Sequence, residues 1–190
     1  MLLDKLKGYQ IILASGSPRR KQFFKDLNID VVIKVNPVDE IYPEHLQAAE
    51  ISDYLAKLKA SVFKGTLRTN DILITSDTVV WYKNESLAKA SNKNEATQML
   101  LKLSGDWHEV ITSVCFTTED KEIVKNHSTK VKFKTLTEEE INYYIENFKP
   151  FDKAGAYGIQ EWIGLIGVEE IKGSYTNVND SNYISNSFSC

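Results

Sequence analysis

The stretch LASGSPRRKQFF, residues 13–24, joins a predicted strand to a predicted helix and places three cations where that helix begins. The apolar run at residues 9–14 predicts the strand. Ser17 is a favourable N-cap, because its hydroxyl accepts from free helix amides, and Pro18 suits the first helical position, where no amide is needed. We therefore expect the helix to begin at this serine–proline pair.

The cations Arg19, Arg20 and Lys21 stand at the end of the helix that carries the positive pole of the backbone dipole. The unfavourable interaction is about 0.3–1 kcal/mol per charge, so cations that point into solvent are tolerated there. A bound anion reverses the sign, because helix amides and guanidinium groups both bind phosphate. The hydroxyls of Ser15 and Ser17 stand beside this end. The stretch is therefore a candidate triphosphate site, and the chain has no Walker-type GxxxxGK(S/T) sequence.

Composition narrows the class of protein. Of the 190 residues, 42% are hydrophobic and 26% are charged, which is typical of a folded globular chain. The net charge of -3 gives no overall attraction to nucleic acid or to a membrane surface, and we expect neither as a partner. No apolar run reaches the about 20 residues of a membrane span, and no signal-peptide segment is evident, so we expect a cytoplasmic protein. Cys115 and Cys190 lack metal-ligand spacing and are expected to be reduced thiols.

Apolar spacing and capping signals predict the other elements. We expect a short buried strand at residues 31–35 and a long helix at residues 44–64. The apolar stripe of that helix is Ile51, Leu55, Leu58 and Val62. Further along we expect a strand at 71–82 with a turn at 83–85, a helix from 92 to 105, a hairpin of 107–118 and 122–136, a helix at 137–148 and a strand near 165–171. Such interleaving predicts a mixed sheet flanked by helices.

Three segments resemble, in order, the signature regions of the Maf family of nucleoside triphosphate pyrophosphatases. They are SGSPRR at 15–20, SDTVV at 76–80 and KAGAYGIQ at 153–160. Shorter matches are QML at 98–100, LSG at 103–105 and GSY at 173–175. The resemblance implies an α/β fold like that of Maf proteins and inosine triphosphate pyrophosphatase: a mixed, strongly twisted sheet flanked by helices, with a long antiparallel hairpin. It also implies a single catalytic domain at residues 1–178.

The resemblance further implies hydrolysis of a nucleoside triphosphate to the monophosphate and pyrophosphate, with a divalent metal cation, Mg²⁺ or Mn²⁺, as cofactor. Asp77 matches the catalytic carboxylate of the family and would activate water or hold the metal; a capping or turn role is the alternative. Glu40 matches a second acidic position and would be catalytic and a metal ligand, since two carboxylates with phosphate oxygens suit magnesium. The neighbouring Asp39 is the alternative to Glu40, and a solvated acidic loop without a catalytic role is the alternative for the pair.

Lys59 and Lys89 match two family lysines, which would neutralise the charge that builds on the phosphates as the bond breaks. The alternative for Lys59 is a solvated lysine on a helix. For Lys89 the match is weakened by Ala90, because the family usually has proline there. The resemblance assigns substrate binding to six further residues, namely Ser15, Ser17, Arg19, Arg20, Thr78 and Gln160.

Gln160 points to the substrate, because a glutamine at the end of this motif is typical of the family branch that acts on dTTP and UTP. A side-chain amide both donates and accepts, and so matches the O4 and N3–H edge of uracil or thymine. We therefore expect hydrolysis of dTTP and UTP, in the removal of unwanted nucleotides from the pool. The alternatives are a purine or modified-nucleotide pyrophosphatase of the same family, and a non-catalytic nucleotide-binding regulator.

The carboxyl terminus departs from the family pattern. Family members usually continue after Gly-Ser-Tyr with a Val-Gly-Leu-Pro segment and a final helix, whereas residues 179–190 here are an atypical polar tail. We therefore expect the last helix to be missing or replaced. The family commonly forms homodimers, so a second copy of the chain is an expected partner beside the nucleotide.

Overall fold

The computed structural model describes residues 2–179, which divide into two compact units. The first unit holds the described residues up to Asp77 together with Thr112–His127, and the second holds Thr78–Ile111 and Ser128–Asn179. The expectation of one catalytic domain stays a prediction. The expected polar tail, apart from Asn179, and the expected loss of a last helix lie outside the described residues.

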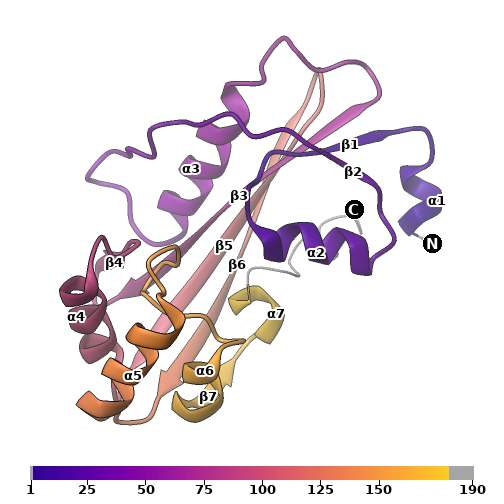
Figure 1. Cartoon of the computed structure of the whole chain (residues 1–190). Helices are drawn as coiled ribbons and strands as arrows, with labels where there is room; N and C mark the ends of the chain where they lie inside the picture. Colours follow the sequence, from indigo (N-terminus) through magenta and orange to yellow (C-terminus); the bar gives the residue numbers. More distant parts are fainter. Residues whose placement is uncertain (1, 180–190) are drawn as a thin grey trace. The chain divides into compact units, whose positions relative to one another are not determined.

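The elements follow the chain in the order drawn in Figure 1. The first unit contains α1 (Leu2–Leu6), β1 (Gln10–Leu13), α2 (Pro18–Asp26), β2 (Val31–Ile33) and α3 (Ala49–Ser61). Long strands that contribute residues to both units are β3 (Asp71–Tyr82), β5 (Trp107–Thr117) and β6 (Glu122–Phe133). The second unit contains β4 (Glu85–Leu87), α4 (Lys93–Leu103), α5 (Glu138–Phe148), α6 (Trp162–Gly167), β7 (Val168–Lys172) and α7 (Tyr175–Val178).

The strands form a mixed sheet with the hydrogen-bonded order β2-β1-β3-β5-β6-β7, and β4 pairs with β3. Strand β1 is parallel to both neighbours, with Ile11 opposite Val31 and Ile72. The β3–β4 and β6–β7 pairs are antiparallel. Strands β5 and β6 are joined by a short turn in which Thr118 N donates to Lys121 O at 2.8 Å. The expected mixed sheet with helices and a long hairpin is confirmed.

In the first unit, α2 and α3 pack on opposite faces of β1, because successive residues of a strand point to opposite faces. Ile11 and Leu13 pack with Phe24 of α2, whereas Ile12 packs with Ala56 of α3. The chain therefore leaves β1 on one face to reach β2, and crosses the other face to reach β3.

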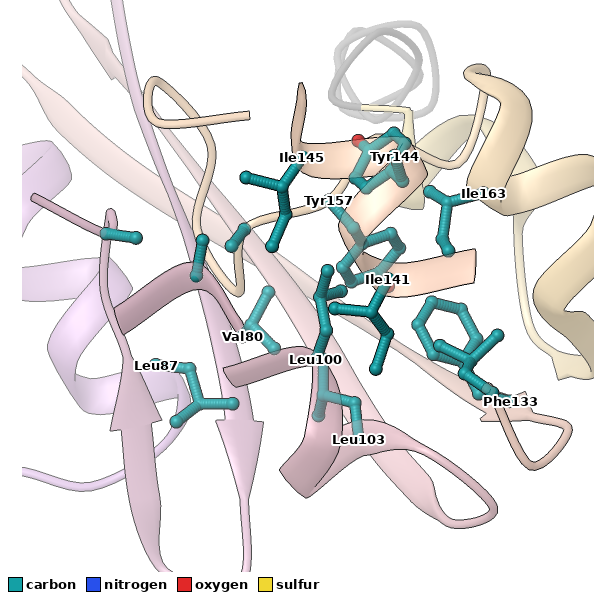
Figure 2. Close-up of a cluster of buried hydrophobic side chains, with 14 of the residues drawn as sticks. Val80, Leu87, Leu100, Leu103, Phe133, Ile141, Tyr144, Ile145, Tyr157 and Ile163 are labelled. Carbon is teal, nitrogen blue, oxygen red and sulfur yellow. The ribbon is translucent and has the colours of Figure 1, made fainter. Parts of the chain in front are cut away.

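The second unit has its own hydrophobic core, shown in Figure 2. Leu100 of α4, Ile141 and Tyr144 of α5, and Phe133 of β6 are each 0% exposed. The two helices begin at the predicted caps: Asn92 accepts from a backbone amide of α4, and Thr137 starts the predicted capping box of α5.

Two predictions about the first unit are wrong in part. The strand at 31–35 is shorter and lies at the sheet edge, so Val32 and Ile33 are each 38% exposed rather than buried. The helix predicted at 44–64 covers only Ala49–Ser61, and Val62 is 41% exposed. Ile51 and Leu55 of the predicted stripe are buried, but the buried face also includes small side chains such as Ala56, which the spacing of the large apolar residues did not reveal.

The strand predicted near residues 165–171 is also partly wrong, because Trp162–Gly167 is helical and the strand begins at Val168. The close packing of this helix on the preceding turn depends on Gly164. A Cβ atom at Gly164 would lie 1.8 Å from the carbonyl oxygen of Ile159, so only glycine allows α6 to pack on that turn. Hydrophobic periodicity alone does not separate a short buried helix from a strand.

Candidate active site

The site lies in the first unit, beyond the carboxyl end of β1 and along the neighbouring parallel strand β3. These strands are neighbours, and the connections that flank them run over opposite faces of the sheet. In open α/β sheets the crevice for a ligand lies at such a point, outside the carboxyl ends of the strands. Ser15 follows β1 closely, and Asp77 lies in β3 beyond Ile74, which pairs with the last residue of β1.

The turn from β1 into α2 is fixed by the serines predicted to bind substrate. Ser17 caps α2, and its Oγ accepts from the backbone N–H of Arg20 at 3.4 Å. The Oγ of Ser15 accepts from the backbone N–H of Ser17 at 3.2 Å and from Nη1 of Arg20 at 3.3 Å. Arg19 is half-buried on the same helical turn. The sequence prediction of a capped helix start with clustered cations is confirmed.

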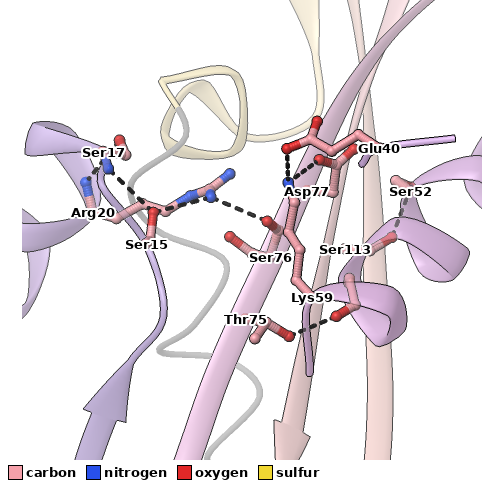
Figure 3. A network of polar contacts seen from close by, with 11 residues as sticks. Ser15, Ser17, Arg20, Glu40, Ser52, Lys59, Thr75, Ser76, Asp77 and Ser113 are labelled. Atoms are coloured by element: carbon pink, nitrogen blue, oxygen red, sulfur yellow. Dashed lines mark hydrogen bonds and ion pairs between the residues drawn. The ribbon is translucent and has the colours of Figure 1, made fainter. Parts of the chain in front are cut away.

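Arg20 connects this turn to β3. Its Nη1 donates to the backbone oxygen of Ser76 at 3.1 Å, across 56 positions of sequence, as Figure 3 shows. Ser76 directly precedes Asp77. The cation from the opening stretch and the predicted catalytic acid are therefore held at one place in the unit.

Asp77 is part of a chain of charges with Lys59 and Glu40 (Figure 3). The Nζ of Lys59 lies 2.6 Å from Oδ1 of Asp77 and 3.0 Å from Oε1 of Glu40. The side chains become more exposed along this chain, from 10% for Asp77 through 18% for Lys59 to 43% for Glu40. Lys59 is thus an ion-pair partner of both carboxylates and not a solvated helix lysine.

Burial raises the pKa of Asp77 above its usual value, because a carboxylate loses hydration when it leaves water. The charge and hydrogen bond of Lys59 lower that pKa, as does the charge of Arg20, whereas the charge of Glu40 raises it. The net direction is upward. A raised pKa makes a carboxylate a better general base.

Polar contacts from the strands hold α3 where Lys59 meets Asp77. The hydroxyl of Thr75 in β3 donates to the carbonyl oxygen of Ala56 at 2.7 Å. Ser113 Oγ of β5 lies 2.6 Å from Oδ1 of Asp53, a residue of α3. Sequence reasoning missed these supporting residues, although polar side chains inside the apolar run of β3 were a visible signal.

The carboxylates of Asp77 and Glu40 fit a hard divalent cation in chemistry. One oxygen atom of each contacts the ammonium group of Lys59, which occupies the position between them. Within residues 2–179, no group of three or more His, Cys, Asp or Glu side chains is placed to hold a metal ion. A cation bound at Asp77 and Glu40 would therefore need further oxygen ligands from phosphate and water, which Mg²⁺ commonly retains.

The other predicted site residues, Thr78, Lys89 and Gln160, belong to the second unit. Thr78 is half-buried and follows Asp77 in β3. Lys89 is exposed and forms an isolated antiparallel bridge with Ala154 in the KAGAYGIQ segment. Gln160 is exposed in the turn before α6. Their predicted roles stay predictions.

Other sequence expectations concern cysteine and the membrane. Cys115 is a free, buried cysteine, and Cys190 lies outside the described residues, so the expectation of reduced thiols stays a prediction. None of the helices within residues 2–179 is both long enough and apolar enough to cross a bilayer.

Comparison with known proteins agrees with the resemblance found in the sequence. Residues 10–179 match the family model described as Maf-like protein. A dTTP/UTP pyrophosphatase of Flavobacterium johnsoniae is 57% identical over 178 residues, which is 94% of this chain and 92% of the relative. A protein of the same name from Christiangramia forsetii is 58% identical over 178 residues, which is 94% of this chain and 91% of the relative. Another from Parabacteroides distasonis is 47% identical over 178 residues, which is 93% of this chain and 92% of the relative. Among solved structures, a nucleoside-triphosphatase (dITP/XTP pyrophosphatase) from Mycobacterium abscessus matches 65% of this chain and 74% of its own, with 15% identity and a TM-score of 0.44.

Proposed function

The chain belongs to the family of Maf-like proteins, and on that premise we propose that it hydrolyses dTTP and UTP to the monophosphate and pyrophosphate. The names of its relatives support this substrate pair. One structural observation carries the proposal: Nη1 of Arg20 donates to the carbonyl oxygen of Ser76, directly before Asp77. That contact joins a cationic helix start to a buried acid, as cleavage of a polyphosphate requires.

The start of α2 binds the triphosphate. The first helix amides point toward an anion, and the guanidinium groups of Arg19 and Arg20 add charge and paired N–H donors. The hydroxyl of Ser15 accepts from the guanidinium group of Arg20, and the hydroxyl of Ser17 accepts from the backbone N–H of the same residue. The cations that are unfavourable at an empty helix start become favourable once phosphate is bound.

Asp77 is the principal catalytic residue. Its raised pKa suits a general base that takes a proton from water as the water oxygen attacks the α-phosphorus. A bond forms between that oxygen and phosphorus, the bond from phosphorus to the bridging oxygen breaks, and pyrophosphate leaves. A role as metal ligand remains the alternative for the same carboxylate.

Glu40 and Asp77 would hold a divalent cation, Mg²⁺ or Mn²⁺, together with phosphate oxygens. When bound, that cation supplies positive charge to the phosphate oxygens. Lys59 balances the two carboxylates and is placed to neutralise charge on the leaving pyrophosphate. Glu40 is favoured over Asp39 for this role because its carboxylate contacts Lys59.

Three further roles are carried over from the family resemblance to residues of the second unit. Lys89 would add charge for the phosphates, and Thr78 and Gln160 would contribute to substrate choice. Removal of unwanted nucleotides, a cytoplasmic location and a homodimer stay predictions.

A nucleotide panel tests the proposed function. Purified protein is mixed with UTP, dTTP, CTP, GTP and 7-methyl-GTP in turn, with Mg²⁺ or Mn²⁺, and released pyrophosphate is measured for the parent and for Asp77→Asn. We expect UTP and dTTP to be preferred, and the variant to lose at least about 100-fold in rate, the scale of a lost general base. Preference for a purine nucleotide would support the family alternative. Tight binding without turnover would support the regulator.

A further inference from the structure

The turn that carries Gln160 is held by a buried polar network in the second unit. Tyr144 of α5 is 0% exposed, and Figure 2 shows it within the hydrophobic core. Its hydroxyl donates to Oε2 of Glu161 and accepts from the backbone N–H of Gly158 at 3.0 Å. The hydroxyl of Tyr144 therefore holds residues on both sides of Gln160, namely Gly158 and Glu161.

The second oxygen of the Glu161 carboxylate is fixed by Lys153. The Nζ of Lys153 lies 3.0 Å from Oε1 of Glu161, and the side chains are 10% and 18% exposed, respectively. Burial and the neighbouring Glu161 carboxylate raise the pKa of Tyr144, so its hydroxyl keeps its proton and remains a donor. The carboxylate is thus immobilised at both oxygens.

The immobilised carboxylate lies beside the amide of Gln160. A Cβ atom at Gly158 would lie 2.9 Å from Nε2 of Gln160 and 3.1 Å from Oε2 of Glu161. Nε2 of Gln160 and Oε2 of Glu161 therefore both lie close to the position that a Cβ atom of Gly158 would take. Negative charge there attracts the amide N–H groups and repels the amide oxygen, which favours the orientation with the nitrogen turned toward Glu161 and the oxygen away from it.

The orientation of this amide has a chemical consequence. A side-chain amide that is free to flip presents either an acceptor or a donor to its partner. Uracil and thymine offer an N3–H donor next to the O4 acceptor, whereas cytosine offers an N3 acceptor next to an amino donor. A glutamine whose amide can flip pairs with uracil or thymine and also with cytosine. A glutamine whose amide is held in one orientation matches only one of these two donor–acceptor patterns.

We propose that Glu161, held by Tyr144 and Lys153, is a positioning residue that orients the Gln160 amide and thereby sets a preference for uracil and thymine nucleotides over cytosine nucleotides. The proposal rests on the proposed function, because it assumes that Gln160 reads the base. Glu161 acts through Gln160 and does not contact the nucleotide.

Steady-state kinetics with UTP and CTP test the proposal. Glu161→Gln keeps the shape of the side chain and removes its charge, and Tyr144→Phe removes the hydroxyl. We expect each to lower the UTP-to-CTP ratio of kcat/KM about 10-fold, the smaller end of what one bidentate base contact contributes. The change should appear mainly as a higher KM for UTP. The matched control is Tyr143→Phe, because Tyr143 is the neighbouring tyrosine of α5, is 49% exposed and packs on Trp162.

A double-mutant cycle separates positioning from general loss of structure. Gln160→Ala should itself remove the preference, and in that background Glu161→Gln should have no further effect on the ratio. A further fall in the ratio when Glu161→Gln is added to Gln160→Ala, or a ratio that neither Glu161→Gln nor Tyr144→Phe changes, overturns the proposal. If Tyr144→Phe fails to fold, Glu161→Gln alone decides.

A spectrum of the Gln160 side-chain amide gives a readout that needs no turnover. In ¹H–¹⁵N spectra its signals are identified by their loss in Gln160→Ala. We expect them to move toward random-coil positions in Glu161→Gln and to stay in place in Tyr143→Phe. If the parent hydrolyses no nucleotide, the proposed function fails and the base preference fails with it. Unmoved amide signals in Glu161→Gln show that Glu161 does not position Gln160.

Discussion

The Nζ atom of Lys59 lies 2.6 Å from Oδ1 of Asp77, although 18 positions of sequence separate the two residues. The same ammonium lies 3.0 Å from Oε1 of Glu40. One lysine therefore compensates two carboxylates, of which Asp77 is buried and depends on a partner for its charge. This relationship makes Lys59 and Glu40 the sharpest places to test the site.

Replacing Lys59 with methionine should lower kcat for UTP at least about 100-fold, because charge on the phosphates is then not neutralised. The pKa of Asp77 should rise further, since Lys59 lowers it in the parent. A base works only when ionised, so the acid side of the kcat/KM profile should move to higher pH. Rates measured across pH test both effects.

The control is Lys57→Met, which removes an exposed lysine from the same helix. It should keep the parent rate and profile. An unchanged pH profile in Lys59→Met would contradict the assignment of Asp77 as the base.

Glu40 and Asp39 can be separated by matched amide substitutions. Glu40→Gln should require a higher Mn²⁺ concentration for half-maximal rate, by about 10-fold, because a neutral amide is a weaker ligand for a hard cation. Asp39→Asn should behave like the parent. Mn²⁺ binding followed by electron paramagnetic resonance checks this without turnover, and the reverse pattern would transfer the role to Asp39.

Arg20→Lys tests the contact between the helix start and β3. Lysine keeps the charge but has no planar fork, so it cannot hold both Ser15 and Ser76 while it binds phosphate. We expect KM for UTP to rise about 10-fold, the scale of one lost charged hydrogen bond. Lys21→Ala removes an exposed cation from the same turn and should have little effect. An equal rise in KM for UTP in the two variants would contradict this assignment, because it would show that the helix start acts only through its overall positive charge.

His108 should make stability depend on pH. It is 3% exposed, its Nε2 lies 2.7 Å from the hydroxyl of Tyr157, and burial lowers its pKa to about 3, opposed by the charge of Asp106. Between pH 6.5 and pH 3 the unfolded chain binds a proton here that the native state does not bind. The free energy of unfolding should therefore fall on acidification, with a slope of up to about 1.4 kcal/mol per pH unit from this group.

Urea unfolding at several pH values measures this slope. His108→Gln should flatten it, whereas His45→Gln, which changes an exposed histidine, should not. Titration of the parent by NMR gives an independent check, because an imidazole signal of His108 that titrates near pH 6.5 would show that the group is not buried in its neutral form.

The sequence predicted the parts of the site that depend on local signals. Ser17 and Pro18 marked the start of α2, whereas Asp77 was assigned through the family resemblance of its segment. The ion pair of Lys59 could not be read in the same way, because it depends on how α3 packs. That packing uses Ala56, whose small side chain carries little periodic signal.

The second unit shows a similar limit. The capping box at Thr137 could be predicted from the sequence because all its members lie within four residues. The helix at Trp162–Gly167 was missed because its cause is the close approach of Gly164 to the Ile159 carbonyl. The contact of Tyr144 with Glu161 joins positions 17 residues apart, so no local sequence pattern predicts it.

The most direct test of the central claim is hydrolysis of UTP in water enriched in ¹⁸O, followed by ³¹P NMR of the products. Attack of water on the α-phosphorus predicts one labelled oxygen in the uridine monophosphate and unlabelled pyrophosphate, at equal amounts of the two products. Label in the pyrophosphate, or orthophosphate as the first product, would contradict the account.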